Sequence, residues 1–313
     1  METVLEVKDM RVGFEIEGEV KQIVYGVDFQ VEKGRVLTIL GESGCGKTVL
    51  GSAILKLLPY NAVVNGEVYF NAAEILAMPE SAFRRLRGKG IAVAMQGGES
   101  GLDPVVRIGR QAAEALMYHE GLSYPKALSR VEEIFLSLGL ANSREILDRY
   151  PHELSGGMNQ RALLGMTAAL QPQFLLLDEP TKGLDAASKA DTIAALTKLI
   201  DGTQSAILLI THDVELARLL SSELLIMYAG EIIEILSPDA LDNPEHPYTK
   251  GLIASAPEGG FIPISGYAPD SRNMPRGCHF APRCKFALAE CAAERPPLSP
   301  KGTGMARCFL PHG

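Results

Sequence analysis

Apolar and polar residues alternate along two segments near the start of the chain, residues 5–14 and 20–31. Alternation with a period of two is the pattern of half-buried strands, because successive side chains of a strand point to opposite faces of the sheet. We therefore predict an antiparallel pair of strands that leads into the core of the protein.

Three shorter runs consist almost entirely of apolar residues: 36–40, 174–177 and 206–210. Such runs are typical of strands that are buried on both faces of a mainly parallel sheet. Polar residues follow each run directly. Because doubly wound α/β sheets bind their ligands at the carboxyl ends of strands, we expect a ligand site at this edge.

The middle of the chain has a helical pattern. Between residues 126 and 140 apolar residues recur at a spacing of three and four, as on the buried face of a helix. From about residue 241 this periodicity fades, while Pro, Gly and Arg become more frequent. We predict an α/β domain over residues 1–240, with a helical subdomain at about 98–160, and an irregular extension over residues 241–313.

Composition limits the classes of function. The 313 residues are enough for roughly two domain-sized units and a sizeable core. The net charge of −8 argues against nucleic acid as the main partner, because a phosphate-binding surface needs an excess of Lys and Arg. No basic leader begins the chain, and no apolar stretch approaches the roughly 18 to 20 residues of a membrane span. We expect a cytosolic chain that could dock on a membrane protein.

Residues 41–48 read Gly-Glu-Ser-Gly-Cys-Gly-Lys-Thr and follow the first apolar run. In this context the segment fits a phosphate-binding loop, in which glycines turn amide groups toward one phosphate, a lysine reaches the β- and γ-phosphates, and a threonine ligates Mg²⁺. The helix predicted over residues 49–58 directs its positive N-terminus at the same anion. The predicted nucleotide-binding residues are Gly41, Ser43, Gly44, Cys45, Gly46, Lys47 and Thr48, of which Thr48 is also a predicted magnesium ligand.

Polar residues also follow the other two apolar runs. Asp178 and Glu179 come directly after residues 174–177, and His212 comes shortly after residues 206–210. Asp178 is placed to hold Mg²⁺ through water, and Glu179 to polarise the water that attacks the γ-phosphate. His212 could contact the γ-phosphate and orient that water, or it could be a packed residue of the core.

Residues 154–161 read Leu-Ser-Gly-Gly-Met-Asn-Gln-Arg and precede the acidic strand. Together with the phosphate loop, this segment resembles the signature sequence of ATP-binding cassette (ABC) proteins. Ser155 and the amides of Gly156 and Gly157 would cap a helix N-terminus and form a second anion site. In that family the signature of one cassette closes over ATP held by the loop of another, so the resemblance implies a pair of cassettes that share two ATP molecules.

The same resemblance implies roles for three further positions. Gln96 matches the glutamine that joins the ATPase core to the helical subdomain and touches Mg²⁺ and water. Asp185 matches a loop that crosses the dimer interface, and Phe14 matches the aromatic residue that stacks on adenine. Tyr25 is an alternative to Phe14, since it also lies near the start of the chain.

The extension resembles the C-terminal region of oligopeptide, dipeptide and nickel importer ATPases, at residues 246–252, 277–284 and 306–309. Some members of that group hold an iron–sulfur cluster on four cysteines, so the resemblance implies a [4Fe–4S] cluster here. Four thiolates could instead hold a structural zinc ion, or stay reduced and unligated, and their spacing does not choose among these alternatives. The predicted ligands are Cys278, Cys284, Cys291 and Cys308.

The resemblance implies an ATP-hydrolysing subunit of an importer that takes up oligopeptides or dipeptides. The expected partners are a second ABC ATPase, with a heterodimer favoured by the distinct tail, two transmembrane permease subunits and, indirectly, an extracytoplasmic solute-binding protein. The chain would then lie on the cytoplasmic face of the membrane. Two alternatives stay open, an importer of nickel or another small solute and an ABC ATPase without a role in transport.

Overall fold

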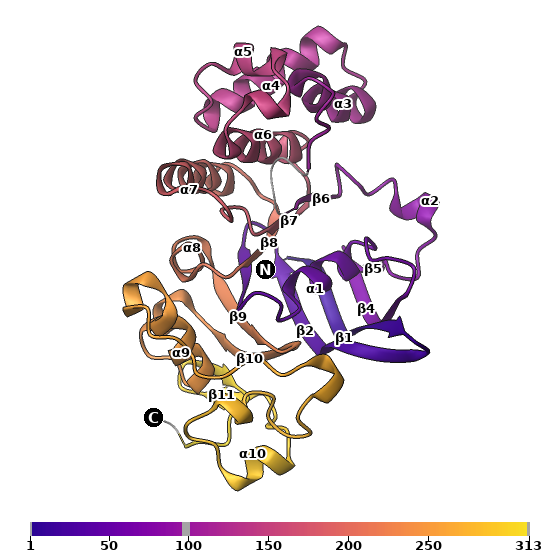
Figure 1. The fold of residues 1–313 in the computed structure, drawn as a ribbon. Coiled ribbons are helices and arrows are strands. Elements are labelled where there is room, and N and C mark those ends of the chain that lie inside the picture. Colours follow the sequence, from indigo (N-terminus) through magenta and orange to yellow (C-terminus); the bar gives the residue numbers. More distant parts are fainter. Residues whose placement is uncertain (1, 96–100, 312–313) are drawn as a thin grey trace. The chain divides into compact units, whose positions relative to one another are not determined.

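The computed structural model describes residues 2–95 and 101–311, drawn in Figure 1. The chain forms two compact units, each assembled from segments that are distant in the sequence. The first unit consists of Met1–Val4, Glu32–Arg35 and Met78–Leu209. The second unit consists of Leu5–Val31, Val36–Ala77 and Ile210–Gly313.

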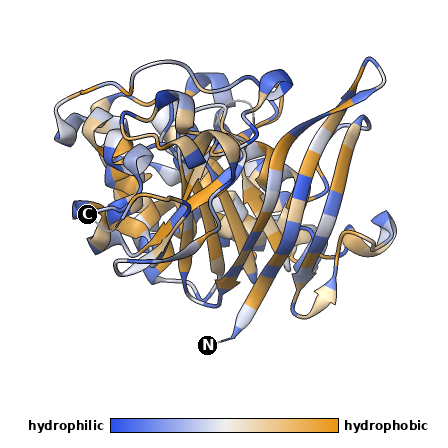
Figure 2. Cartoon of the chain, turned by 90° about the horizontal axis from the view of Figure 1, so that it is seen from below, coloured by the Kyte–Doolittle hydropathy of each residue, from blue (hydrophilic) through white to orange (hydrophobic). Residues whose placement is uncertain are grey.

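An antiparallel sheet in the second unit contains β2 (Glu19–Glu32), β1 (Thr3–Ile16), β4 (Ala62–Phe70) and β5 (Ala73–Glu74), in this order. The β1–β2 hairpin turns at Glu17 and Gly18, whose φ angles of 54° and 80° are both positive, as in a type I′ turn. Figure 2 shows the alternation of apolar and polar residues along these long strands. The predicted antiparallel pair is confirmed, and its strands extend a few residues beyond the predicted bounds.

A second group of strands in this unit contains β11 (Ser299–Lys301), β12 (Gly304–Ala306), β10 (Glu231–Leu236), β9 (Glu223–Tyr228) and β3 (Val36–Leu40), in this order. β3 and β9 run parallel, whereas β10 is antiparallel to both β9 and β12. Every residue of β3 is buried, as its apolar sequence predicted. Two strands from the end of the chain therefore extend the sheet that leads into the phosphate loop.

The helices of the second unit are α1 (Lys47–Ile54), α8 (Val214–Leu220), α9 (Pro247–Ser255) and α10 (Ala289–Ala293). The predicted helix over residues 49–58 was too long at its C-terminus, because α1 ends at Ile54. Lys56 has a φ of 54°, a left-handed conformation that does not continue an α-helix. Short 3₁₀ helices in this unit span Pro238–Asp242, Pro257–Gly259, Ser271–Asn273 and Ala281–Arg283.

The first unit contains β8 (Ala206–Thr211), β7 (Phe174–Asp178) and β6 (Ile91–Ala94), in this order, with β6 and β7 parallel. Its helices are α2 (Glu80–Phe83), α3 (Ile108–Glu120), α4 (Tyr124–Ser137), α5 (Ser143–Asp148), α6 (Gly156–Ala168) and α7 (Ala186–Asp201), with a 3₁₀ turn at Pro151–Glu153. A Cβ on Gly165 would lie 3.0 Å from two ring atoms of Phe135, so α4 and α6 pack closely. The helical pattern around residues 126–140 is thus confirmed as α4.

The core of the second unit joins the sheet to the C-terminal extension. Leu40, Ile226 and Tyr228 from the strands pack in one cluster with Tyr248 and Phe280 from the extension. All five are buried, and all except Phe280 have no exposed surface. The extension therefore shares its hydrophobic core with the strand that leads into the phosphate loop.

Candidate functional site

The phosphate loop connects β3 to α1 and depends on glycine at two positions. A Cβ on Gly41 would lie 2.2 Å from the carbonyl oxygen of Met227, so no larger residue fits there. Gly46 is the N-cap of α1 with a φ of 109°, a value that side chains other than that of glycine rarely allow. Ser43, Gly44 and Thr48 are exposed. The loop can therefore present amides and one hydroxyl to an anion at the start of α1.

Lys47 bends back over this loop. Its Nζ donates to the carbonyl oxygens of Gly41, at 2.7 Å, and of Glu42, at 3.0 Å. The side chain is almost fully buried. Nζ also donates to Sγ of Cys45 at 3.9 Å, so the positive charge of Lys47 is held inside the loop.

Cys45 fills the interior of the loop rather than its surface. The residue is 7% exposed, and burial raises the pKa of its thiol although Lys47 opposes that shift. A buried neutral thiol is a poor nucleophile and a poor ligand. Cys45 therefore serves the loop through packing, through its backbone and as an acceptor for Nζ of Lys47.

His212 lies beside the phosphate loop in the same unit. The amide of Gly41 donates to the carbonyl oxygen of Thr211, the residue before His212, at 3.4 Å. Asp213 then caps α8 by accepting from the amide of Leu216 at 3.2 Å. His212 itself is exposed, so this residue is not packed in the core.

The two aromatic candidates for adenine differ in their surroundings. Tyr25 is engaged by the extension, because its ring lies 5.0 Å from that of His279 and 5.7 Å from the guanidinium carbon of Arg295. Its hydroxyl donates to the carbonyl oxygen of Gln22 at 3.0 Å. Phe14 lies half-buried near the end of β1, opposite Ala62. These contacts favour Phe14, whose role in adenine stacking stays a prediction.

The acidic pair belongs to the first unit, at the end of β7. All residues of β7 are buried, and Asp178 is 1% exposed. Glu179 follows with a φ of 49°, a left-handed conformation that is unfavourable for a residue with a side chain. Strained backbone of this kind concentrates at functional sites.

The signature residues of the first unit form a capped helix N-terminus. Ser155 is the N-cap of α6, and its Oγ accepts from the amide of Met158 at 3.2 Å. Ser155 and Gly156 are exposed, whereas Gly157 is buried. A Cβ on Gly157 would lie 2.7 Å from the Cβ of Ser188, so this glycine allows α6 to approach α7.

Asp185 is the N-cap of α7. Its carboxylate accepts from the amides of Ala187 and Ser188, both at 3.0 Å, and from the Ser188 hydroxyl at 2.7 Å. Hydrogen bonds from Ser188 lower the pKa of Asp185 below its usual value. The sequence analysis missed this capping role, although Asp before a helical segment is a standard signal for it.

The predicted catalytic set thus divides between the two units. The second unit holds the phosphate loop and His212, and the first holds Asp178, Glu179, the signature and Asp185. Gln96 lies outside the described residues. The sequence analysis also missed two partners of the loop in the extension: Tyr248 and Arg283 both bind Glu42.

The four cysteines of the extension are neighbours but do not form a ligand group. The amide of Cys278 donates to the carbonyl oxygen of Cys291 at 2.8 Å. Burial, and then the nearby Cys291 and Cys308, raise the pKa values of Cys278 and Cys284. Within residues 2–95 and 101–311, no three His, Cys, Asp or Glu side chains are arranged to hold a metal ion. This geometry gives the predicted [4Fe–4S] cluster no support.

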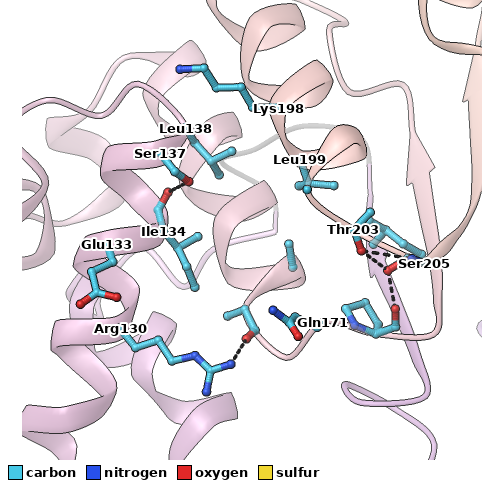
Figure 3. Close-up of a pocket in the computed structure, with 15 residues that line it drawn as sticks. Arg130, Glu133, Ile134, Ser137, Leu138, Gln171, Lys198, Leu199, Thr203 and Ser205 are labelled. Atoms are coloured by element: carbon cyan, nitrogen blue, oxygen red, sulfur yellow. Dashed lines mark hydrogen bonds between the residues drawn. The ribbon is translucent and has the colours of Figure 1, made fainter. Parts of the chain in front are cut away.

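The first unit also contains a cavity of ≈ 400 Å³ that is separate from the predicted site residues (Figure 3). It is lined by residues around α4 and α7, including Ile134, Leu138 and Leu199. Arg130 also lines the cavity and donates to the carbonyl oxygen of Ala169, another lining residue, at 3.4 Å. None of the described predicted site residues lines this cavity.

Comparison with known families gives two matches. Residues 24–182 match the family described as "ABC transporter". Residues 234–291 match the family described as "Oligopeptide/dipeptide transporter, C-terminal region". The two matches follow each other along the chain and correspond to the two resemblances stated above.

Relatives of known name match nearly the whole chain. The probable peptide ABC transporter ATP-binding protein y4tR of Sinorhizobium fredii is 38% identical over 94% of this chain and 91% of the relative. The oligopeptide transport ATP-binding protein OppD of Salmonella typhimurium is 35% identical over 98% and 93%. A solved dimer of the ATP-binding cassette MJ0796 with ADP and phosphate matches with a TM-score of 0.67 and 22% identity, over 75% of this chain and 98% of that chain. That likeness establishes the fold.

Proposed function

Because the chain belongs to the ABC transporter family, which includes ATPases that energise transport, we propose that it is the ATP-hydrolysing subunit of an importer for oligopeptides or dipeptides. The observation that carries the substrate class is the match of residues 234–291 to the C-terminal region of oligopeptide and dipeptide transporters. This chain covers 91% and 93% of the length of two relatives whose names refer to peptide or oligopeptide transport. Import of nickel or another small solute is the alternative.

The ATP site proposed here begins at the phosphate loop. Amides of residues 43–46 and the Nζ of Lys47 would bind the phosphates, and Phe14 would stack on adenine. The exposed Thr48 hydroxyl and the Asp178 carboxylate are oxygen ligands of the kind that Mg²⁺ prefers, with Gln96 as a third candidate. Mg²⁺ would neutralise charge on the β- and γ-phosphates.

Hydrolysis would need no covalent intermediate. Glu179 polarises a water molecule whose oxygen bonds to the γ-phosphorus while the bond to the β–γ bridging oxygen breaks, which releases ADP and phosphate. His212 orients that water near the γ-phosphate. Lys47 holds the phosphates in line, so positioning and charge neutralisation supply most of the rate acceleration.

The signature would act on the ATP of a second cassette. The N-terminus of α6, where Ser155 and Gly156 are exposed, carries the positive end of a helix dipole, which suits an anion. Ser155, Gly156 and Gly157 would close over ATP bound to the partner's phosphate loop, with Asp185 near the interface. We favour a heterodimer with a related cassette, because this chain carries a distinct C-terminal extension.

The remaining partners would be two transmembrane permease subunits and, through them, an extracytoplasmic solute-binding protein. None of the helices found in the described part of the chain is sufficiently long and apolar to cross a membrane. From the resemblance to peptide-importer ATPases we propose peripheral attachment at the cytoplasmic face. The cassette would span residues 1–240 and the extension residues 241–313.

The cysteine set carries a finer proposal, a [4Fe–4S] cluster with zinc as the alternative. The resemblance of the tail supports it, whereas the thiols as they lie do not form a ligand group, so no step of the mechanism is assigned to a cluster. Iron near four per chain after anaerobic purification would support the cluster. Stoichiometric zinc without iron, or neither metal, would rule it out.

Reconstitution tests the proposed function. The chain would be purified with its partner ATPase and permease subunits, placed in liposomes, and given solute-binding protein with or without ligand. ATP hydrolysis should rise when peptide is present, and Lys47→Ala in this chain should reduce that rise. A rise with nickel chelate and none with peptide would favour the alternative. An ATPase rate that is the same with and without the permease subunits would argue against a role in transport.

A further inference from the structure

Glu42, the second residue of the phosphate loop, is bound by two residues of the C-terminal extension. Arg283 donates from Nη1 to Oε2 at 2.8 Å and from Nη2 to Oε1 at 3.1 Å, a bidentate pair. Tyr248 Oη accepts from the Glu42 amide at 2.9 Å. With Lys47 on its carbonyl oxygen, Glu42 has partners for its amide, carbonyl and carboxylate groups. The extension thus contacts the backbone and the side chain of the loop itself.

The side chain of Arg283 is held in place by contacts other than those with Glu42. Its side chain is 6% exposed and also donates to the carbonyl oxygens of Ser265, at 3.1 Å, and of Ile264, at 3.4 Å. Burial disfavours the charged guanidinium, but hydrogen bonds to Glu42 and Tyr228 outweigh it and raise the pKa of Arg283. A guanidinium held in this way loses little freedom when it binds a carboxylate.

Tyr248 is equally fixed. Its fully buried ring lies 4.6 Å from that of Tyr228 on β9 and 5.5 Å from that of Phe280. The segment that carries Phe280 and Arg283 is anchored to β10, since Nδ1 of buried His279 lies 3.0 Å from Oε2 of Glu231. Packed rings and buried polar contacts allow little movement, so the hydroxyl of Tyr248 is a rigid acceptor.

The charge of Glu42 makes these contacts relevant to ATP. A carboxylate that flanks the first glycine of a phosphate loop repels a triphosphate, and such repulsion is strong where the surroundings are partly dry. Arg283 neutralises that carboxylate with two charge-assisted hydrogen bonds. Without Arg283, the loop would hold an uncompensated negative charge near its anion site.

We propose that Arg283 and Tyr248 are positioning residues for ATP, which hold the phosphate loop through Glu42 and offset its charge. This inference rests on the proposed function, since it assumes that residues 41–48 bind ATP. It makes the C-terminal extension part of the nucleotide site rather than an appendage of the cassette.

The test measures equilibrium binding of a fluorescent ATP analogue with Mg²⁺ to the full chain. Arg283→Ala should weaken binding by roughly tenfold, the loss expected for one charge-assisted contact. Adding Glu42→Gln should restore affinity to near that of Glu42→Gln alone, because the repelling charge is gone. Arg272→Ala is the matched control, since Arg272 lies in the same extension and pairs with exposed Asp270. This control should bind ATP like the unaltered chain.

A second variant separates positioning from stability. Tyr248→Phe keeps the ring and removes only the acceptor of the Glu42 amide, so affinity should fall severalfold while the urea midpoint changes little. Lys47→Ala reports on the proposed site itself. If Lys47→Ala binds ATP normally, the proposed site is wrong. If Lys47→Ala fails to bind, the inference is overturned by either of two results: normal affinity in Arg283→Ala and Tyr248→Phe, or a defect in Arg283→Ala that Glu42→Gln leaves unrelieved.

Discussion

The two anion sites of this chain are built differently. The phosphate loop is closed upon itself by Lys47 and is held from outside by Tyr248 and Arg283. The signature has only its own Ser155 as a cap, and it leaves Ser155 and Gly156 exposed. A loop whose supports all lie in one unit is preformed for an anion before any partner arrives. A helix N-terminus whose first residues are exposed fits a ligand that is bound to another molecule.

The largest effect is expected for a variant that impairs the hydrolysis step and leaves both anion sites intact. Glu179→Gln keeps the shape of the side chain but cannot take a share of the proton from water. Turnover should fall by roughly 10²- to 10⁴-fold, whereas ATP binding should persist and a closed dimer should accumulate. Single-turnover hydrolysis and size-exclusion chromatography with ATP check this result. Unchanged turnover would remove Glu179 from the mechanism.

The next effect should appear at the phosphate loop alone. Lys47→Ala removes the donor to Gly41 and Glu42 together with the proposed phosphate contact, so ATP affinity should fall by about 10- to 100-fold. Lys126→Ala, at an exposed position of α4, is the control and should leave affinity unchanged. Equal ATP affinities in the unaltered chain, Lys47→Ala and Lys126→Ala would show that this loop is not the ATP site.

A variant of the signature should give the opposite pattern. Ser155→Ala removes the cap of α6, so hydrolysis by the paired cassettes should fall severalfold while ATP binding to the isolated chain stays normal. Ser123→Ala offers a matched comparison, because Ser123 occupies the N-cap of α4 without a side-chain hydrogen bond. If Ser155→Ala weakened binding in the isolated chain, the contrast between the two sites would fail.

The smallest effect concerns Asp185, whose pKa is lowered from its usual value of 3.8 in the folded chain. A carboxylate with a depressed pKa stabilises the fold above its unfolded pKa, and this contribution is lost as the pH falls through the folded value. Asp185→Asn should therefore lower the urea midpoint slightly at neutral pH, with the difference shrinking below pH 3.8. An equal difference in urea midpoint at neutral and at acidic pH would contradict this account.

Local patterns predicted much of the fold. The alternation at the start of the chain became β1 and β2, and the apolar runs became β3, β7 and β8, because burial on one face or two leaves a direct imprint on sequence. The glycines of the loop could be predicted as well, because the backbone geometry of such a loop requires glycine. The end of α1 was not, because it depends on the left-handed conformation of Lys56.

The role of the extension could not be read from local patterns. Glu42 and Arg283 lie 241 positions apart in the sequence. The residues that flank each of them give no sign of the contact. The strands of the extension are only three residues long, too short for a periodic signal. For the cysteines, the family resemblance implied a metal cluster, whereas ligation depends on side-chain positions that neither resemblance nor spacing determines.

The central claim is that each phosphate loop is half of a shared site. The most direct measurement follows ATP binding and ATP hydrolysis by the isolated chain across a range of protein concentrations, and then with its partner cassette added. Binding per chain should be constant, while hydrolysis per chain should be slow in the dilute monomer and rise steeply on pairing. Turnover that is fast in the monomer and independent of concentration and partner would contradict the account.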